Sequence, residues 1–327
     1  MFIEDKLKKE YEWAANELGS NPALDQKILL AARRELANRK VKKKSMFLRP
    51  KLTHVAASFV LLTGFGFATH SLLYKENTGS VQIEVQAVKD FALTQIAPEE
   101  IRRELASVEN KLATGETAIV YFAELAKEKH PFFQQNPVIG VEKPEVVADW
   151  KQWDEISKKA SLSHSLPKQL ADDFTFREGK LGTPYGAMIG QGGETWLQEL
   201  QQESKETGKS VVWKVVPNTA SPINTYTTLY QNEQKANIYF TVEVLPEDQL
   251  NIQVSTPETT TYEPVEVNGK KAHYTSNDHF LFSDSGQYKE LTWVSKEGEQ
   301  TIMYHMATDS LAVSKEMLKQ AAEATQF

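Results

Sequence analysis

The sequence of 327 residues contains no cysteine. This absence excludes disulfide bonds, thiolate zinc sites, iron–sulfur clusters and a cysteine nucleophile. The sequence also lacks the His-Glu-x-x-His and Gly-x-Ser-x-Gly motifs, a Walker loop and an EF-hand loop. Charged residues make up 25% and apolar residues 40% of the chain, which is ordinary for a folded protein. We therefore expect a globular protein that is not an enzyme and that uses no cofactor.

Charge is distributed unevenly along the chain. Residues 1–51 carry 13 Lys and Arg against 7 Asp and Glu, whereas the rest of the chain carries 24 against 37. Between these parts, residues 52–74 form a run of 23 residues without Asp, Glu, Lys or Arg. As a helix this run would be about 34 Å long, enough for a hydrocarbon core of about 30 Å. It predicts a transmembrane helix, with anchoring side chains Leu52, Val55, Phe59, Val60, Leu61, Leu62, Phe65, Phe67, Leu72 and Leu73.

Two other readings of the apolar run remain open, a signal peptide and a buried core helix. About 50 residues precede the run, which is too many for a signal peptide, and the run is longer than most core helices. Residues 38–51 hold seven basic residues and no acidic residue. Because basic flanks stay in the cytoplasm, we expect a single-pass cell-membrane protein with a cytoplasmic N-terminus. The basic run holds a single aromatic residue, which gives no interleaved pattern, so we expect contact with anionic lipid and not with nucleic acid.

The cytoplasmic residues 1–51 are expected to form two helices. Gly19 fits the end of the first helix, and Asn21 with Pro22 fits the start of the second. Such a pair buries little apolar area alone and would gain from a partner. The alternative is a solvated stalk next to the membrane. The candidate partner face is Ile3, Leu7, Tyr11, Leu18, Leu24, Ile28 and Leu36.

The remaining residues 75–327 are expected to form an extracytoplasmic α+β domain. Helices are predicted to begin at Pro98 and Pro144, to surround Trp196 and to close the chain over 311–325 with Leu311 facing inward. Residues 117–125 read as a buried strand. From residue 210 onward strands follow one another, including 279–283 and a hairpin turn at Asn268-Gly269. This order predicts a curved antiparallel sheet packed with helices.

Candidate sites for chemistry in this domain are weak. His273, His279 and His305 lie on neighbouring predicted strands and could surround a metal, but scattered strand histidines are more often hydrogen-bonded or exposed. Asp172-Asp173, and Asp278 with Asp284, are carboxylate pairs of a kind that an acidic domain produces by chance. The glycine-rich residues 190–196 fit a flexible turn better than an anion site. The aromatic residues are either core residues or the lining of an apolar pocket: Trp150, Trp153, Trp196, Trp213, Tyr239, Phe240 and Trp293.

Several segments resemble a domain of unknown function found in Gram-positive single-pass membrane proteins. The segments are LPKQLADDFTF (166–176), LATGETAIVYFAELAKEKHPFF (112–133) and the ordered set VNGKKAHYT (267–275), LTWVSKEGEQTIMYHM (291–306) and LAVSKEMLKQAAEA (311–324). This family is similar to the LolA/RseB-like fold, a half-barrel sheet covered by helices. Some members look like anti-sigma factors. The resemblance therefore implies a LolA/RseB-like extracytoplasmic domain and a cytoplasmic segment that binds a sigma factor.

Two functions follow as expectations. The first is a membrane-anchored regulatory protein in which an external sensor domain is coupled to a cytoplasmic helical segment that binds a sigma factor. The alternative is an anchored module that binds a lipid, a lipoprotein or another component of the cell envelope.

Overall fold

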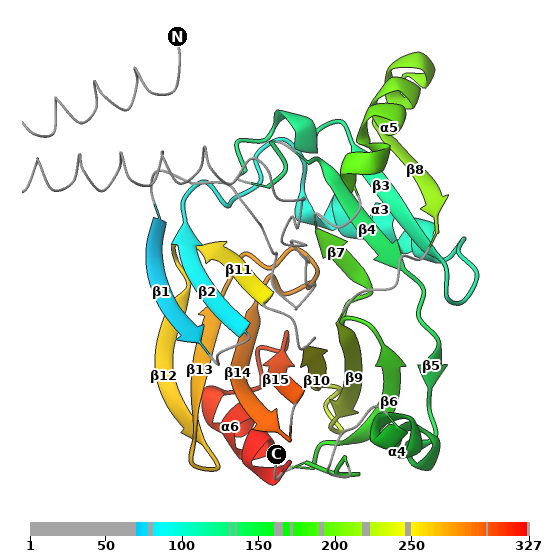
Figure 1. Ribbon diagram of the computed structural model, residues 1–327. Helices are drawn as coiled ribbons and strands as arrows, with labels where there is room; N and C mark the ends of the chain where they lie inside the picture. The colour runs from blue at the N-terminus through cyan, green and yellow to red at the C-terminus, as the bar shows by residue number, and fades with distance from the viewer. Residues whose placement is uncertain are drawn as a thin grey trace, which may run out of the picture. The chain divides into compact units, whose positions relative to one another are not determined.

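The computed structural model describes residues 70–327, apart from 78–80, 131, 135, 160–165, 171–172, 190–192, 218–222, 246–249, 299 and 326–327. These residues form a mostly β structure with four α-helices and three sheets (Figure 1). The fold is therefore α+β, as the sequence predicts. Its strands are divided among three sheets, where the sequence predicts one.

The large sheet has eight strands, and every neighbouring pair in it is antiparallel. In sheet order the strands are β12 (Thr261–Val267), β13 (Lys270–Asn277), β14 (Tyr288–Glu297), β15 (Gln300–Thr308), β10 (Asn237–Leu245), β9 (Asn224–Gln231), β6 (Thr175–Leu181) and β5 (Val146–Val147). Six of these strands, β9, β10 and β12 to β15, come late in the chain, and only β11 (Leu250–Pro257) of another, smaller sheet interrupts their order.

Two helices cover one face of the large sheet. Helix α6 (Lys315–Ala324) packs on β12, β14 and β15, and helix α4 (Trp150–Lys159) packs on β5 and β6. The Ser314 side chain caps α6 by accepting a hydrogen bond from the Met317 N–H. Between the helices and the sheet lies the main core, in which the rings of Phe240, Trp293 and Tyr304 stack.

The opposite face of the large sheet is partly covered by a small sheet, in the order β1-β2-β11. Its strands are β1 (His70–Asn77), β2 (Val81–Val88) and β11 (Leu250–Pro257). Strand β1 pairs with β2 antiparallel, whereas β11 pairs with β2 in parallel. Apolar residues from β2 and β11 pack with Leu245 and Met303 of the large sheet.

A third sheet has the order β7-β4-β3-β8 and lies between two helices. Helix α3 (Pro98–Glu109) packs on one face, and α5 (Gly193–Thr207) packs on the other. The strands are β3 (Thr117–Phe122), β4 (Val138–Glu142), β7 (Ala187–Ile189) and β8 (Val211–Val216), and a short 3₁₀ helix, η2 (Leu125–Lys127), follows β3. Figure 1 shows this sheet and α5 at the end of the fold away from α6.

Several predicted elements are confirmed. Helix α3 begins at Pro98 as the sequence predicts, and its stripe residues Ile101, Leu105 and Val108 are buried. The strand predicted from residue 117 is β3, and α5 contains the predicted helix around Trp196. The Asn268-Gly269 turn joins β12 and β13 with φ values of 50° and 76°, both in the left-handed region that this turn requires.

Other predictions are wrong in identifiable ways. The helix predicted from Pro144 begins only at Trp150, because Val146 and Val147 pair with β6. Residues 279–283 form turns and not a strand, and Leu311 is 71% exposed because α6 begins four residues later.

The transmembrane helix predicted for residues 52–74 is wrong over its last five residues. Its residues 52–69 lie outside the described residues, but residues 70–74 belong to β1, where they pair with β2. Within the part of the chain that the structure describes, no helix has the length and apolar character needed to cross a bilayer.

Candidate functional site

The two faces of the large sheet differ in chemistry because successive side chains of a strand point to opposite sides. In β10, Phe240 and Val242 enter the main core. Thr241 and Glu243 are also buried but point to the other face. Strands β13, β14 and β15 repeat this alternation, so buried threonines, glutamates and histidines gather on the face that the small sheet covers.

A trio of ionisable side chains lies on that buried face: Glu243 of β10, Glu290 of β14 and His305 of β15. Their exposed fractions are 0%, 0% and 2%. His305 stands opposite Thr241 and Thr292, and the two glutamates are each two residues along from those threonines, at diagonal positions. We call Glu243, Glu290 and His305 the buried trio.

Contacts within the buried trio are incomplete. Nδ1 of His305 lies 2.9 Å from Oε1 of Glu290, which also accepts a hydrogen bond of 3.1 Å from the Tyr288 hydroxyl. Nε2 of His305 lies 3.4 Å from Oε2 of Glu243, an ion-pair distance without hydrogen-bond alignment. Both oxygens of Glu243 and Oε2 of Glu290 are buried without a hydrogen-bond partner. Such atoms are uncommon inside proteins, and each one raises the free energy of the folded state.

The trio holds protons more tightly than isolated groups would. Burial lowers the pKa of His305, but Glu290 and Glu243 outweigh this effect and raise it to about 10. Burial raises the pKa of Glu243, and His305 offsets this only in part. The arrangement therefore favours a charged His305 imidazolium beside a Glu243 carboxyl that resists ionisation.

A second group of polar side chains links β1 to the large sheet through hydrogen bonds. Nδ1 of His273 lies 3.1 Å from the Tyr262 hydroxyl, and its Nε2 lies 2.8 Å from Oε2 of Glu76. The same Glu76 oxygen is 3.0 Å from Nζ of Lys271. The Tyr74 ring stacks on the His273 ring with centroids 3.8 Å apart. Strand β1 is therefore joined to β12 and β13 by the stacking of Tyr74 on His273 and on Tyr262 and by one network of hydrogen bonds.

The protonation states of His273 and Glu76 follow from their surroundings. Burial lowers the pKa of His273, and Glu76 offsets this only in part. A neutral His273 fits both contacts, because Tyr262 then donates to Nδ1 while Nε2–H donates to Glu76. Burial raises the pKa of Glu76, but hydrogen bonds from His273 and Lys271 outweigh it and lower the value, so Glu76 is the charged partner.

The structure does not bring the three predicted metal histidines together. His273 contacts Glu76, His305 lies in the buried trio, and His279 is partly exposed beside Asp278, at 2.6 Å. Among the described residues no cluster of three His, Cys, Asp or Glu side chains could hold a metal ion.

The predicted carboxylate pairs do not form a site either. Asp284 is fully exposed and pairs with Arg102 at 3.0 Å, whereas the other member, Asp278, pairs with His279. Asp172 lies outside the described residues, and Asp173 occupies a turn with φ of 65°.

The remaining predicted residues fall into three groups. Trp153, Phe240 and Trp293 are core residues, whereas Tyr239 points to the other face and packs against Tyr185. Trp196 and Trp213 are partly buried against the clusters of the third sheet, and Trp150 is half-buried at the start of α4. Of the predicted anchor, Leu72 is 55% exposed on β1 and Leu73 packs against the cluster under the small sheet, so a helix is wrong for these two. The other anchor residues, the whole cytoplasmic partner face and Gly190 to Gly192 of the glycine-rich stretch lie outside the described residues.

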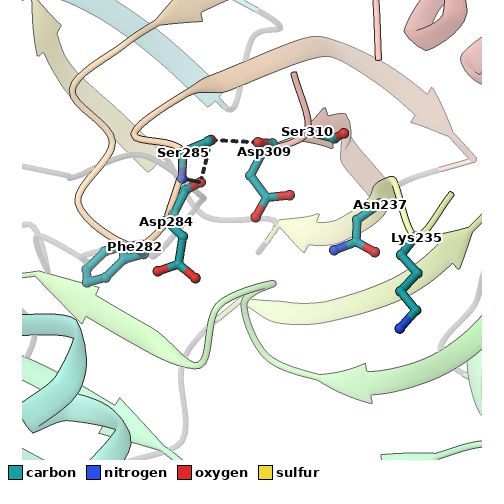
Figure 2. Close-up of a pocket in the computed structure, with 8 residues that line it drawn as sticks. Lys235, Asn237, Phe282, Asp284, Ser285, Asp309 and Ser310 are labelled. Atoms are coloured by element: carbon teal, nitrogen blue, oxygen red, sulfur yellow. Dashed lines mark hydrogen bonds between the residues drawn. The ribbon is translucent and has the colours of Figure 1, made fainter. Parts of the chain in front are cut away.

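An open polar pocket lies near the β9–β10 turn, with a volume of about 310 Å³. Figure 2 shows the carboxylates of Asp284 and Asp309 extending in the same direction, with Asn237 and Lys235 on the other side of the hollow. Burial raises the pKa of Asp309, and the nearby Asp284 adds to this effect. Arg102 holds the loop in place through Asp284 and the carbonyl oxygen of Leu281. The pocket offers hydrogen-bonding groups of both charges and little apolar surface.

Sequence reasoning missed the buried trio as a group. The available signal was a charged or titratable residue in the middle of an apolar strand, as at Glu243 in NIYFTVEVL and His305 in QTIMYHM. Comparison with protein-family models, curated proteins and solved structures finds no match to this chain.

Proposed function

We propose that the chain is a membrane-anchored regulatory protein in which an external sensor domain controls a cytoplasmic helical segment that binds a sigma factor. One observation carries the proposal. Strand β1 begins at His70, directly after the apolar residues 52–69, and it fastens onto the large sheet beside the buried trio. A helix of these 18 residues would be about 27 Å long, within the range of membrane-spanning helices. The predicted span would then continue into the folded domain without a linker.

The coupling would act through β1. A ligand or a change of conditions that moves β1 would move the end of the predicted span, because the two are continuous in the chain. On the inside, the candidate partner face of residues 1–51 would hold or release a sigma factor. The proposal thus requires two sites that one connected element links, which is the minimum for a coupled response.

We also propose the LolA/RseB-like fold for the external domain. The large antiparallel sheet with α4 and α6 on one face supports this reading. The third sheet, with α3 and α5, would be an addition to such a fold.

The alternative function is that of an anchored envelope-binding module, and the polar pocket is the observation that favours it. Asp309, Asn237 and Lys235 would suit a polar ligand better than a lipid. The enclosed cavity between the small and large sheets is only about 10 Å³, far too small for an acyl chain. Under this alternative, the ligand that the polar pocket would bind is a polar component of the envelope.

The test is recovery of partners by the full chain, solubilised in detergent and carrying an affinity tag. Leu24→Asp and Ile28→Asp place charge on the candidate partner face, and Gln26→Asp places the same charge off it. We expect mass spectrometry to find one sigma factor with the original chain and with Gln26→Asp, and to lose it with the other two. Recovery of no sigma factor, or equal recovery by all variants, would refute the regulatory proposal.

A further inference from the structure

The interface between the small and large sheets is mismatched in polarity. Strands β2 and β11 present apolar side chains, among them Val85 and Val254. Opposite them the large sheet presents Thr275, Thr292 and His305 next to the apolar Met303, so only part of this surface matches them. The enclosed cavity between these groups, about 10 Å³, has room for no more than one water molecule. In this closed arrangement the buried trio has almost no hydration.

The small sheet is held less firmly than the helices on the opposite face. The cluster beneath it contains eight buried apolar residues among those described, against twenty-two in the main core. Its further ties are the stack of Tyr74 on His273 and the contacts of Glu76 with His273 and Lys271. Local opening is expected where apolar contacts are fewest. Lifting the small sheet is therefore a direct way to bring water to the trio.

The net charge of the buried trio depends on how many protons it holds. With His305 charged, one glutamate ionised and the other protonated, the group is neutral. Loss of the carboxyl proton leaves one net negative charge, and loss of the imidazolium proton as well leaves two. An uncompensated buried charge is strongly destabilising, and hydration removes most of that cost.

We propose that the small sheet β1-β2-β11 is a latch that closes over the buried trio while the trio holds its protons and opens when they are lost. Closure is thereby tied to acid or neutral conditions, and release to alkaline conditions. The buried trio is a proton-binding site in this scheme, and opening the small sheet is its response.

The other titratable groups near the trio do not account for such a response. Burial raises the pKa of Tyr74, which faces the trio from β1, so this hydroxyl stays neutral. His273 of β13 has its pKa lowered by burial and loses its proton at lower pH than His305 does. Glu76 pairs with His273 and Lys271, and the Tyr288 hydroxyl donates a hydrogen bond to Glu290. Toward the trio β2 and β11 present apolar side chains.

The latch itself is a property of the external domain, but its meaning as a signal rests on the proposed regulatory function. Strand β1 belongs to the small sheet and continues from the predicted span. Opening would therefore free the first strand after the membrane, which is the element through which we propose that the two sides communicate.

The absence of cysteine makes a direct test simple, because one introduced thiol is the only thiol in the chain. Three full-length variants in detergent are compared. Val85→Cys reports on the small sheet, Ala272→Cys on the main core and Leu311→Cys on an exposed position; these residues are 3%, 0% and 71% exposed. The rate of alkylation by iodoacetamide is measured from pH 6 to pH 10 and divided by that of the Leu311 variant, which removes the effect of pH on the thiol itself.

We expect the normalised rate of Val85→Cys to rise with pH by up to about tenfold per unit for each proton released. The rate for Ala272→Cys should stay low and constant. Combining Val85→Cys with Glu243→Gln, Glu290→Gln and His305→Gln keeps the trio hydrogen-bonding but removes its ionisation, and the rise should disappear.

Three outcomes would overturn the latch. They are a flat normalised rate for Val85→Cys, a rise that survives in the neutral-trio variant, or a parallel rise for Ala272→Cys, which would indicate unfolding of the whole domain. None of these readouts involves a sigma factor, so failure of the latch is distinguishable from failure of the proposed function.

Discussion

Substituting Gly179 with alanine should strongly destabilise the folded part of the chain that the structure describes. Gly179 lies in β6, paired with Val147 of β5 and Thr228 of β9, and the indole of Trp153 from α4 packs directly on it. A Cβ atom at this position would lie 2.0 Å from Cδ2 of Trp153, whereas ordinary contacts begin at 3.4 Å. The ring would have to move by about 1.4 Å, the difference between these distances.

The magnitude follows from what that movement breaks. Trp153 is completely buried, and its Nε1–H donates a 2.8 Å hydrogen bond to the Thr228 hydroxyl. Overpacking a core costs about 1–3 kcal/mol, and leaving a buried donor unpaired costs about 1–3 kcal/mol more. We expect a loss of about 3–5 kcal/mol, which lowers the melting temperature by about 10 °C.

The assay is thermal and urea unfolding of the full chain in detergent, followed by tryptophan fluorescence. Gly115→Ala is the control, because its Cβ would contact nothing within 4 Å and only its φ of 85° is strained. That strain costs about 1–2 kcal/mol. In a Trp153→Leu background Gly179→Ala should cost less than about 1 kcal/mol. A small effect of Gly179→Ala alone, or an equal effect in both backgrounds, would refute the packing argument.

Three further predictions concern stability. Glu128→Gln should cost about 2 kcal/mol in urea unfolding, because Glu128 accepts hydrogen bonds from the backbone N–H groups of Thr94 and Gln95 at 2.8 and 2.6 Å. Burial raises the pKa of Glu128, but these hydrogen bonds outweigh it and lower the pKa. The contribution of Glu128 to the free energy of unfolding is therefore present above about pH 4.5 and is lost as pH falls. If Glu128→Gln loses stability with falling pH just as the original chain does, the prediction is contradicted. Asn268→Ala should cost about 1 kcal/mol through its φ of 50° while Asn268→Gly is nearly neutral, and equal melting temperatures for the two would speak against a strained turn. The pKa of His305 is raised to about 10, so its contribution to the free energy of unfolding is complete below about pH 6.5 and declines toward pH 10. The decline is at most about 1.4 kcal/mol per pH unit. Urea midpoints that do not fall between pH 7 and pH 9 would rule this out.

Elements with local signals are predictable from the sequence. Pro98 fixes the start of α3, and Asn268-Gly269 fixes the β12–β13 turn, because in each case the signal and the structure lie in the same few residues. Residues 70–74 show the limit of such reasoning. An apolar run is compatible with a helix or a strand, and pairing with β2 decides between them here.

The buried trio shows the same limit for the site. The sequence places Glu243 and His305 inside apolar strands, but their meeting depends on the register that sets Thr241 opposite His305. Register is fixed by packing and hairpin geometry across the whole sheet, and a shift of one residue would send His305 to the other face. The chemistry of each residue was visible in the sequence, and their proximity was not.

The parallel pairing of β2 with β11 has a consequence for how the chain folds. Val81 lies opposite Leu250, its partner 169 residues later in the chain. Closing so long a loop is slow, and a chain made from its N-terminus finishes β2 long before β11 exists. During synthesis the apolar residues of β2 would therefore have one unpaired strand edge, which could pair with a wrong strand. Completion of the small sheet would be a late step, and the folding of this domain would depend on protection of β2 until the C-terminal third of the chain arrives.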